Sequence, residues 1–354
     1  VDYIKPVMGE SEKMKAAVVG TTSWGTTLAI VLARQGIETD IITRNIGEAQ
    51  DLNSNRQNVK RLPNHIFPDI LKATADKHTS ISKANIIVIA VPSSSYRDNI
   101  SMLKTIPIRS DSIIISATKG LEKNTGYRMS EVFSQELSGK HDSKFSALSG
   151  PNLAHEIVDQ KPGSTVIASK NSIVATKGQN ILNSEFLRVY TNTDLTGVEL
   201  GGSLKNIVAI GAGFIDGMGL GDNSKSAFIS RAIAEITRLG IAAGAELTTF
   251  AGLACLGDLL ATCYSSLSRN RYVGEKIAAG ENLENILLEL GQVAEGIDTV
   301  SATLLLANKL NVTMPITEQT YLVLNEGLDP KTAITRLMTR VPKPEDPLWN
   351  INTP

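Results

Sequence analysis

The pattern of apolar residues changes near Val198, and this change constrains the fold more than any other feature of the sequence. Before that point, short apolar runs typical of buried strands alternate with runs at helical spacing, which predicts an α/β domain with a parallel sheet. After it, only helical spacing remains. We therefore expect a flexible lead-in at residues 1–14, an α/β domain at 15–196, an all-helical domain at 197–341 and a loose tail at 342–354.

The α/β domain opens with a strand, a helix and a second strand, at residues 15–20, 26–35 and 37–42. The first turn reads G-T-T-S-W-G, which matches the G-x-G-x-x-G fingerprint of dinucleotide-binding folds except for Thr22 at the middle glycine. The pattern predicts a Rossmann-like, doubly wound sheet. Gly20 and Gly25 would let a pyrophosphate bind at the helix N-terminus. The Thr22 side chain leaves less room there, because the middle glycine normally lets the backbone approach the pyrophosphate closely. An ordinary tight turn is the alternative.

The second strand ends in Arg44, where NAD-binding folds usually carry a carboxylate for the ribose hydroxyls. Asp40 comes too early in the strand, and Glu48 comes after the turn. A guanidinium offers a fork of donors that suits a 2′-phosphate. Arg44 therefore favours NADP(H), with NAD(H) also possible. A solvent-facing arginine without this role is the alternative.

Two further apolar strands end in polar residues. Residues 85–91 precede three serines at 93–95, and residues 112–118 precede Lys119. Open α/β sheets bind ligands outside the carboxyl ends of their strands. Lys119 could thus meet a phosphate or a carbonyl group, or it could be an ordinary loop charge.

Residues 200–206 begin the helical half and place Lys205 and Asn206 beside an apolar helical run. Gly201 and Gly202, just upstream, would let a ligand or a second backbone come close. An amine beside an apolar wall is poorly solvated in its charged form, which suits Lys205 to proton transfer near neutral pH. A lysine on a helix surface is the alternative.

Farther along, Asp258 and Thr262 lie one helical turn apart, so a helix would present both on one face. Asp258 could hold Lys205 as an ammonium and Thr262 could bond to the same site, unless Asp258 merely caps a helix. Arg269 and Asn270 follow. An arginine fork beside an amide suits a phosphate, and a solvated basic turn is the alternative.

Glycines interrupt the apolar pattern that follows Lys205. We expect the first helix of this half to end near Gly213 and a glycine-rich loop to follow it. Asn223 or Ser224 could then cap the next helix. The small residues at 242–245 permit close helix contact, which suits an interlocked helical domain or the core of a homodimer.

Charge and composition exclude several classes of function. The formal net charge is −1, so the chain lacks the excess of positive charge that is typical of proteins that bind nucleic acid or an anionic membrane. Cys255 and Cys263 lack disulfide-framework or zinc spacing, and the four histidines are scattered, so no metal site is expected. No uninterrupted apolar run reaches the ~20 residues of a membrane helix. The first residues do not resemble a signal peptide, and a cytoplasmic protein is expected.

Together these motifs resemble those of the bacterial-type NAD(P)-dependent glycerol-3-phosphate dehydrogenases, from residue 16 to residue 340. The run G-T-T-S-W-G-T-T-L-A corresponds to the family's G-A-G-S-W-G-T-A-L-A. The family's other motifs are nearly intact at residues 117–122, 149–151, 197–202, 204–206, 216–217, 221–223, 251–253, 257–259, 268–271 and 314–318.

The resemblance implies reversible reduction of dihydroxyacetone phosphate to sn-glycerol 3-phosphate, which supplies glycerophospholipid synthesis. A homodimer is the default expectation for such a helical domain. Lys205 is then the general acid and base, with Lys119, Asp258 and Thr262 beside it. The turn pattern already gives Gly20 and Gly25 as cofactor contacts. The resemblance adds Ser23, Trp24, Arg44, Lys119, Ala154, Arg269, Val293 and Glu295. The implied substrate contacts are Lys119, Gly150, Asn152, Lys205, Asn206, Asp258, Ser268, Arg269 and Asn270.

The chain departs from the family pattern at two places. Thr21 and Thr22 replace the usual Ala-Gly, which bears on cofactor affinity, and Asn152 replaces a serine or threonine. Two other functions stay open at this stage. One is a 3-hydroxyacid dehydrogenase of the same superfamily, which favours a carboxylate over a phosphate. The other is a nucleotide-sensing or scaffold protein whose altered turn no longer supports turnover.

Overall fold

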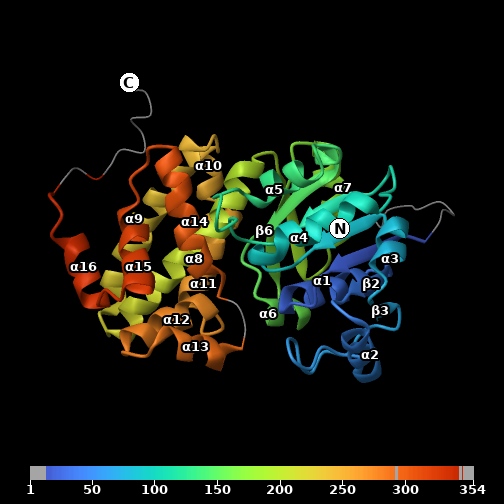
Figure 1. The fold of residues 1–354 in the computed structure, drawn as a ribbon, viewed down its shortest axis with the longest axis horizontal. Coiled ribbons are helices and arrows are strands. Elements are labelled where there is room, and N and C mark those ends of the chain that lie inside the picture. Colours follow the sequence, from blue (N-terminus) through green and yellow to red (C-terminus); the bar gives the residue numbers. More distant parts are fainter. Residues whose placement is uncertain (1–12, 292–293, 343–344, 346–354) are drawn as a thin grey trace.

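The computed structural model describes residues 13–291, 294–342 and 345. A domain built on a sheet and a helical domain lie side by side (Figure 1). The expectation of a Rossmann-like α/β domain followed by helices is confirmed. Most of the predicted lead-in, most of the predicted tail and the predicted cofactor residue Val293 lie outside the described residues.

The sheet has eight strands in the order β3-β2-β1-β4-β5-β6-β7-β8. The pairs are parallel except for β6 with β7. The order reverses between β1 and β4, and open α/β sheets bind their ligands beside such a switch point. The strands are β1 Lys15–Val19, β2 Glu38–Ile42, β3 Leu71–Thr74, β4 Ile86–Ile89, β5 Ile113–Ser116, β6 Phe145–Ser149, β7 Gly163–Ala168 and β8 Leu187–Asn192.

Helices cover both faces of the sheet, which explains why its central strands are apolar throughout. Alternate residues of β1 face opposite cores: Val18 belongs to one core cluster, and Ala17 and Val19 to another. The helices of this domain are α1 Ser23–Arg34, α2 Ile46–Asn55, α3 Lys77–Lys83, α4 Tyr96–Ser101, α5 Met129–Glu136, α6 Ala154–Val158 and α7 Ser172–Leu182.

The helical domain is arranged around α8, a helix of 23 residues with almost every side chain buried. Glycines allow it to touch a neighbouring helix backbone to backbone, because a Cβ at Gly274 of α12 would lie 2.0 Å from the Ile210 carbonyl oxygen. The helices are α8 Leu195–Gly217, α9 Gly221–Ala242, α10 Leu247–Phe250, α11 Asp258–Tyr264, α12 Arg269–Ala278, α13 Leu283–Leu290, α14 Glu295–Lys309, α15 Pro315–Glu326 and α16 Pro330–Met338. A π-helical segment, Leu253–Gly257, leads into α11.

The expected end of the first helix near Gly213 is wrong, and so is the expected glycine-rich loop. The helix continues to Gly217, and α9 already begins at Gly221 rather than after Asn223 or Ser224. Packing is the reason. A Cβ at Gly213 would lie 2.1 Å from the Arg271 carbonyl oxygen, so the glycine serves close helix contact and does not break the helix.

Two helical stretches, Leu195–Gly217 and Leu247–Tyr264, are long and apolar enough to cross a membrane by length and composition. The apolar window of the first is 100% buried inside the protein. Its apolar character is therefore accounted for by the core of the helical domain. The window of the second is 44% buried, and this stretch contains the π-helical segment that packs against α8.

Candidate active site

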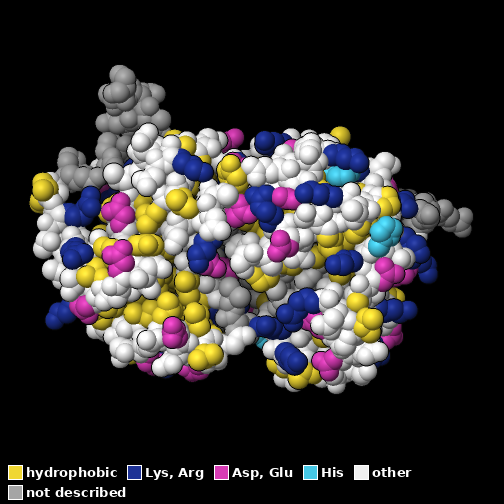
Figure 2. Space-filling view, in the orientation of Figure 1, with side chains coloured by type: hydrophobic (Ala, Val, Ile, Leu, Met, Phe, Trp, Pro, Cys, Tyr) yellow, Lys and Arg dark blue, Asp and Glu magenta, His cyan; other side chains and the backbone are white. Residues whose placement is uncertain are grey.

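The segments that follow β5 and β6 meet the N-terminal half of α8 at the carboxyl edge of the sheet. Lys119 lies on the first segment and Gly150 on the second. The surface is hollowed where the two domains meet, with basic side chains on the sheet-domain side of the hollow (Figure 2). This edge is where an open α/β sheet is expected to bind its ligand.

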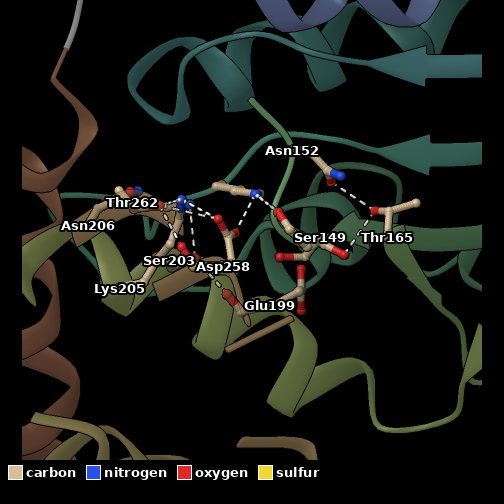
Figure 3. Close-up of polar contacts among 12 residues, drawn as sticks. Ser149, Asn152, Thr165, Glu199, Ser203, Lys205, Asn206, Asp258 and Thr262 are labelled. Atoms are coloured by element: carbon tan, nitrogen blue, oxygen red, sulfur yellow. Dashed lines mark hydrogen bonds and ion pairs between the residues drawn. The ribbon is translucent and has the colours of Figure 1, made fainter. Parts of the chain in front are cut away.

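Asp258 holds two lysines here, one with each carboxylate oxygen (Figure 3). Lys205 Nζ donates to Oδ1 at 2.7 Å, and Lys119 Nζ donates to Oδ2 at 2.6 Å. The exposed side-chain fractions are 9% for Lys205, 15% for Lys119 and 3% for Asp258. A buried charge requires a partner, so the single carboxylate allows both ammonium groups to be buried together.

Thr262, one turn after Asp258 in α11, completes the surroundings of the Lys205 amine. Its Oγ1 accepts a hydrogen bond from Lys205 Nζ at 2.7 Å and donates one to the Asp258 carbonyl oxygen at 2.6 Å. The hydroxyl proton is thereby directed at the helix backbone, which leaves a lone pair for the amine. The structure thus brings together the three side chains that the sequence predicted to meet.

Gly201 and Gly202 let two other segments lie against α8 just before Lys205. A Cβ at Gly201 would lie 2.7 Å from Cys255 Cβ in the π-helical segment, and one at Gly202 would lie 2.2 Å from Ser149 Oγ at the end of β6. A larger residue at either position would push these segments away from the lysine. The close approach expected from the two glycines is therefore present.

Ser203 links the Lys119 segment to α8, and the sequence analysis missed it. Its Oγ accepts a hydrogen bond from the Gly120 N–H at 2.9 Å and donates one to the Glu199 carbonyl oxygen at 2.7 Å. Lys119 Nζ also donates to the Gly150 carbonyl oxygen at 3.0 Å, so both backbone and side chain of this segment are fixed. The only sequence signal was a serine within a buried helical run, because its partner lies 83 positions away.

The charges of the site act on one another. Burial lowers the pKa of Lys119, and the Lys205 ammonium acts in the same direction, whereas Asp258 opposes both. Loss of water raises the pKa of Glu295 at the start of α14, while Arg269, Lys205 and Lys119 act to lower it. Three cations thus share the site with two carboxyl groups. Such a field suits an anionic phosphate ester and an oxygen that becomes negative during reaction.

A chain of amides lies beside Lys205. Asn206 Oδ1 accepts from Asn270 Nδ2 at 3.0 Å, and Asn270 Oδ1 accepts from a backbone N–H in the first turn of α14 at 3.0 Å. Ser268 is the N-cap of α12, and the exposed Arg269 is the first residue of that helix. The helix N-terminus therefore brings a guanidinium, an amide and a favourable dipole to the same place, which suits an anion.

The two predicted substrate residues after β6 are held by β7. Gly150 has φ +152°, and a Cβ there would lie 2.9 Å from Thr165 Cα, so glycine is required. Asn152 points toward Thr165 (Figure 3): its Oδ1 accepts from Thr165 Oγ1 at 2.8 Å, and its Nδ2 donates to the Ser164 carbonyl oxygen at 3.2 Å. A contact of Asn152 with substrate stays a prediction.

The turn after β1 keeps its shape although the middle glycine is Thr22. Gly20 has φ +112°, and a Cβ there would lie 2.5 Å from the Ala90 carbonyl oxygen, so this glycine is required by the chain itself. Thr22 has φ −65° and caps α1, because its Oγ1 accepts a hydrogen bond from the Gly25 N–H at 3.0 Å. The same hydroxyl donates to the Ala90 carbonyl oxygen at 2.8 Å. The N-terminus of α1 therefore still fits a pyrophosphate at the carboxyl edge.

Half of the other predicted cofactor residues lie near this turn. Ser23 and Trp24 form the first turn of α1, and Trp24 packs against the core of the sheet domain. Ala154 begins α6, and its carbonyl oxygen accepts a hydrogen bond from α1 at 3.2 Å. Arg44 lies after β2 with 84% of its side chain exposed. Glu295 begins α14 in the helical domain, where the charges of Lys205 and Lys119 act on it, and Val293 is outside the described residues.

Comparison with known proteins relates both halves of the chain to one family. The family models described as the NAD-dependent glycerol-3-phosphate dehydrogenase N-terminus and C-terminus match residues 15–175 and 194–335. A Prosthecochloris aestuarii protein named glycerol-3-phosphate dehydrogenase (NAD(P)+) is 44% identical over 332 residues, which cover 94% of this chain and 100% of that protein.

Solved structures extend the similarity to three dimensions. The crystal structure of a glycerol-3-phosphate dehydrogenase from Coxiella burnetii matches with a TM-score of 0.88 and 36% identity, over 93% of this chain and 99% of that chain. A 2-dehydropantoate 2-reductase from Geobacter metallireducens has a TM-score of 0.58 and 13% identity, over 89% of this chain and 100% of that one. The second likeness is one of fold alone.

Proposed function

Because the chain belongs to the NAD-dependent glycerol-3-phosphate dehydrogenase family, we propose that it catalyses the reversible, NAD(P)-dependent reduction of dihydroxyacetone phosphate to sn-glycerol 3-phosphate. The observation that carries this proposal is the carboxylate of Asp258 between the amines of Lys205 and Lys119. A nearly enclosed ammonium pair at the carboxyl edge of a dinucleotide-binding sheet is suited to the reduction of a carbonyl group.

Lys205 acts as the general acid in the direction of reduction. It donates a proton from Nζ to the ketone oxygen, on which negative charge grows, and it takes this proton back from the hydroxyl in the reverse direction. Lys119 adds a second positive charge beside the same oxygen. Asp258 and Thr262 hold the Lys205 amine in place. The nicotinamide coenzyme, when bound, supplies or receives the hydride.

Arg269 anchors the substrate phosphate at the start of α12, with Ser268 and Asn270 beside it. Fixing the phosphate turns a freely moving ketone into one held against Lys205, and such positioning accounts for a large part of many enzymatic rate enhancements. Asn206 and the segment after β6, with Gly150 and Asn152, contact the rest of the substrate. The phosphate end of the substrate is therefore bound by α12, and its ketone end lies against α8.

The coenzyme binds at the turn after β1. The turn glycines and the N-terminus of α1 take the pyrophosphate, and Ser23, Trp24 and Ala154 lie around it. Arg44 offers its exposed guanidinium to a 2′-phosphate, which favours NADP(H), while NAD(H) is also accepted. Glu295 and Val293 are expected to complete the nicotinamide end. We further expect a cytoplasmic homodimer whose product feeds glycerophospholipid synthesis.

The test is a pair of absorbance assays on the purified protein, one for each direction of the reaction. NADPH, and separately NADH, is mixed with dihydroxyacetone phosphate, and the loss of reduced coenzyme is followed. We expect turnover that depends on the phosphate substrate, and formation of reduced coenzyme when sn-glycerol 3-phosphate and NADP+ are supplied instead. Oxidation of a 3-hydroxyacid without any reaction of dihydroxyacetone phosphate would overturn the proposal.

A further inference from the structure

A carboxylate lies between the turn after β1 and the end of β2. Glu48 Oε1 accepts a hydrogen bond from Thr21 Oγ1 at 2.6 Å. Its Oε2 accepts from the Arg44 backbone N–H at 3.1 Å and from Arg44 Nε at 3.4 Å. Glu48 is thus tied to the glycine turn and to the end of the second strand at once, although it belongs to neither.

This position is where a dinucleotide-binding sheet meets the adenosine ribose. In such folds a carboxylate beyond the end of the second strand binds the ribose hydroxyls, and an arginine nearby accommodates a 2′-phosphate. Asp40 does not serve, because it lies within β2 and accepts a hydrogen bond from Ser80 Oγ at 2.7 Å. Of the acidic residues on β2 and in the first turn of α2, Glu48 is the one bonded to the glycine turn.

The charge of Glu48 is well defined. Partial burial acts to raise the pKa of its carboxyl group, but hydrogen bonds from Thr21 and Arg44 outweigh this and leave the pKa below its usual value. The carboxylate is 22% exposed, whereas the Arg44 side chain beside it is 84% exposed. A 2′-phosphate near Arg44 would therefore also lie near a fixed negative charge.

We propose that Glu48, anchored by Thr21, is a coenzyme-selecting residue: it accepts a hydrogen bond from the adenosine ribose of NAD(H) and repels the 2′-phosphate of NADP(H). Glu48 then opposes the preference that Arg44 alone would give. The inference rests on the proposed function only in assuming that the turn binds NAD(P). It also gives the departure at Thr21 a role, since an alanine there has no hydroxyl to hold the carboxylate.

The test compares Glu48→Gln with Asp51→Asn, a control that removes one exposed negative charge from the same helix, α2. Dissociation constants for NAD+ and NADP+ are measured by calorimetric titration without substrate, and kcat/KM is measured with NADH and NADPH. In Glu48→Gln we expect both ratios to shift about tenfold toward the phosphorylated coenzyme. Asp51→Asn should leave both ratios unchanged. Thr21→Val should shift them in the same direction by a smaller factor.

Unchanged ratios in Glu48→Gln, or equal shifts in Glu48→Gln and Asp51→Asn, would overturn the inference. The titrations do not depend on catalysis, so they test the role of Glu48 in coenzyme selection even if dihydroxyacetone phosphate is not reduced. Absence of reduction with either coenzyme would defeat the proposed function instead. Thermal unfolding of each variant shows whether a lost affinity comes from a lost fold.

Discussion

Asp258→Asn tests the arrangement on which the proposed chemistry depends. The change keeps the shape of the side chain and removes its charge. The amide oxygen can still accept from one lysine, but the amide nitrogen then faces the other ammonium, donor against donor. Lys205 and Lys119 are left as a buried like-charged pair without the carboxylate that now separates them.

The geometry sets the size of the effect. Asp258 bonds each ammonium nitrogen through one of its oxygens, and two opposite unit charges about 4 Å apart attract by about 4 kcal/mol at an effective dielectric constant of about 20. Asparagine lacks this attraction, and its loss corresponds to about three pH units in the loss of the first proton from the pair. Reduction requires an ammonium group, so the rate falls when that proton is lost. The alkaline limb of the pH profile should therefore move to lower pH by up to about three units.

The assay is the pH dependence of kcat/KM for dihydroxyacetone phosphate at saturating NADPH. Alongside it, NADP+ affinity is titrated and thermal unfolding is followed, because removing one partner of a buried ion pair costs about 3–5 kcal/mol of stability. We expect Asp258→Asn to be less stable and slower, with its alkaline limb shifted and its NADP+ affinity nearly unchanged.

Asp216→Asn is the matched control. Asp216 also serves two cations, accepting from Lys225 Nζ at 2.8 Å and from Arg271 Nη1 at 2.6 Å. Its loss should lower stability without moving the alkaline limb. A folded Asp258→Asn enzyme with an unshifted limb would refute the reasoning, because the carboxylate would then not keep the lysine pair protonated.

Three further predictions concern single positions. Lys205→Ala should keep the fold and NADP+ binding but lower turnover by ~100-fold or more, and near-normal turnover of the purified variant would rule out its role as general acid. Arg269→Ala should weaken binding of glycerol 3-phosphate more than binding of coenzyme. Both ligands are titrated, and an unchanged affinity for glycerol 3-phosphate would contradict the role of Arg269. Thr22→Gly should tighten NADP+ binding by about tenfold through closer backbone approach to the pyrophosphate. Equal or weaker affinity would mean that Thr22 does not obstruct the coenzyme.

The sequence by itself determined the elements and the kind of site. Apolar runs before Val198 and helical spacing after it predicted the fold class, since these patterns report which face of each segment is buried. The spacing of Asp258 and Thr262 predicted a shared helix face, and the structure places Lys205 against that face. Such inferences succeed because they use contacts within one strand or one helix.

Only the tertiary structure decided which residues from distant parts of the chain are in contact. Lys119 and Asp258 are 139 positions apart, so no local pattern could show that one carboxylate serves both lysines. The sequence pattern predicts a helix end near Gly213, and only the contact of this glycine with α12 explains why α8 continues. Glu48 follows the turn after β2 in the sequence, and only the fold places it against Thr21. Hydrogen bonds and charges act through space over a few ångströms, so their partners depend on how distant segments pack.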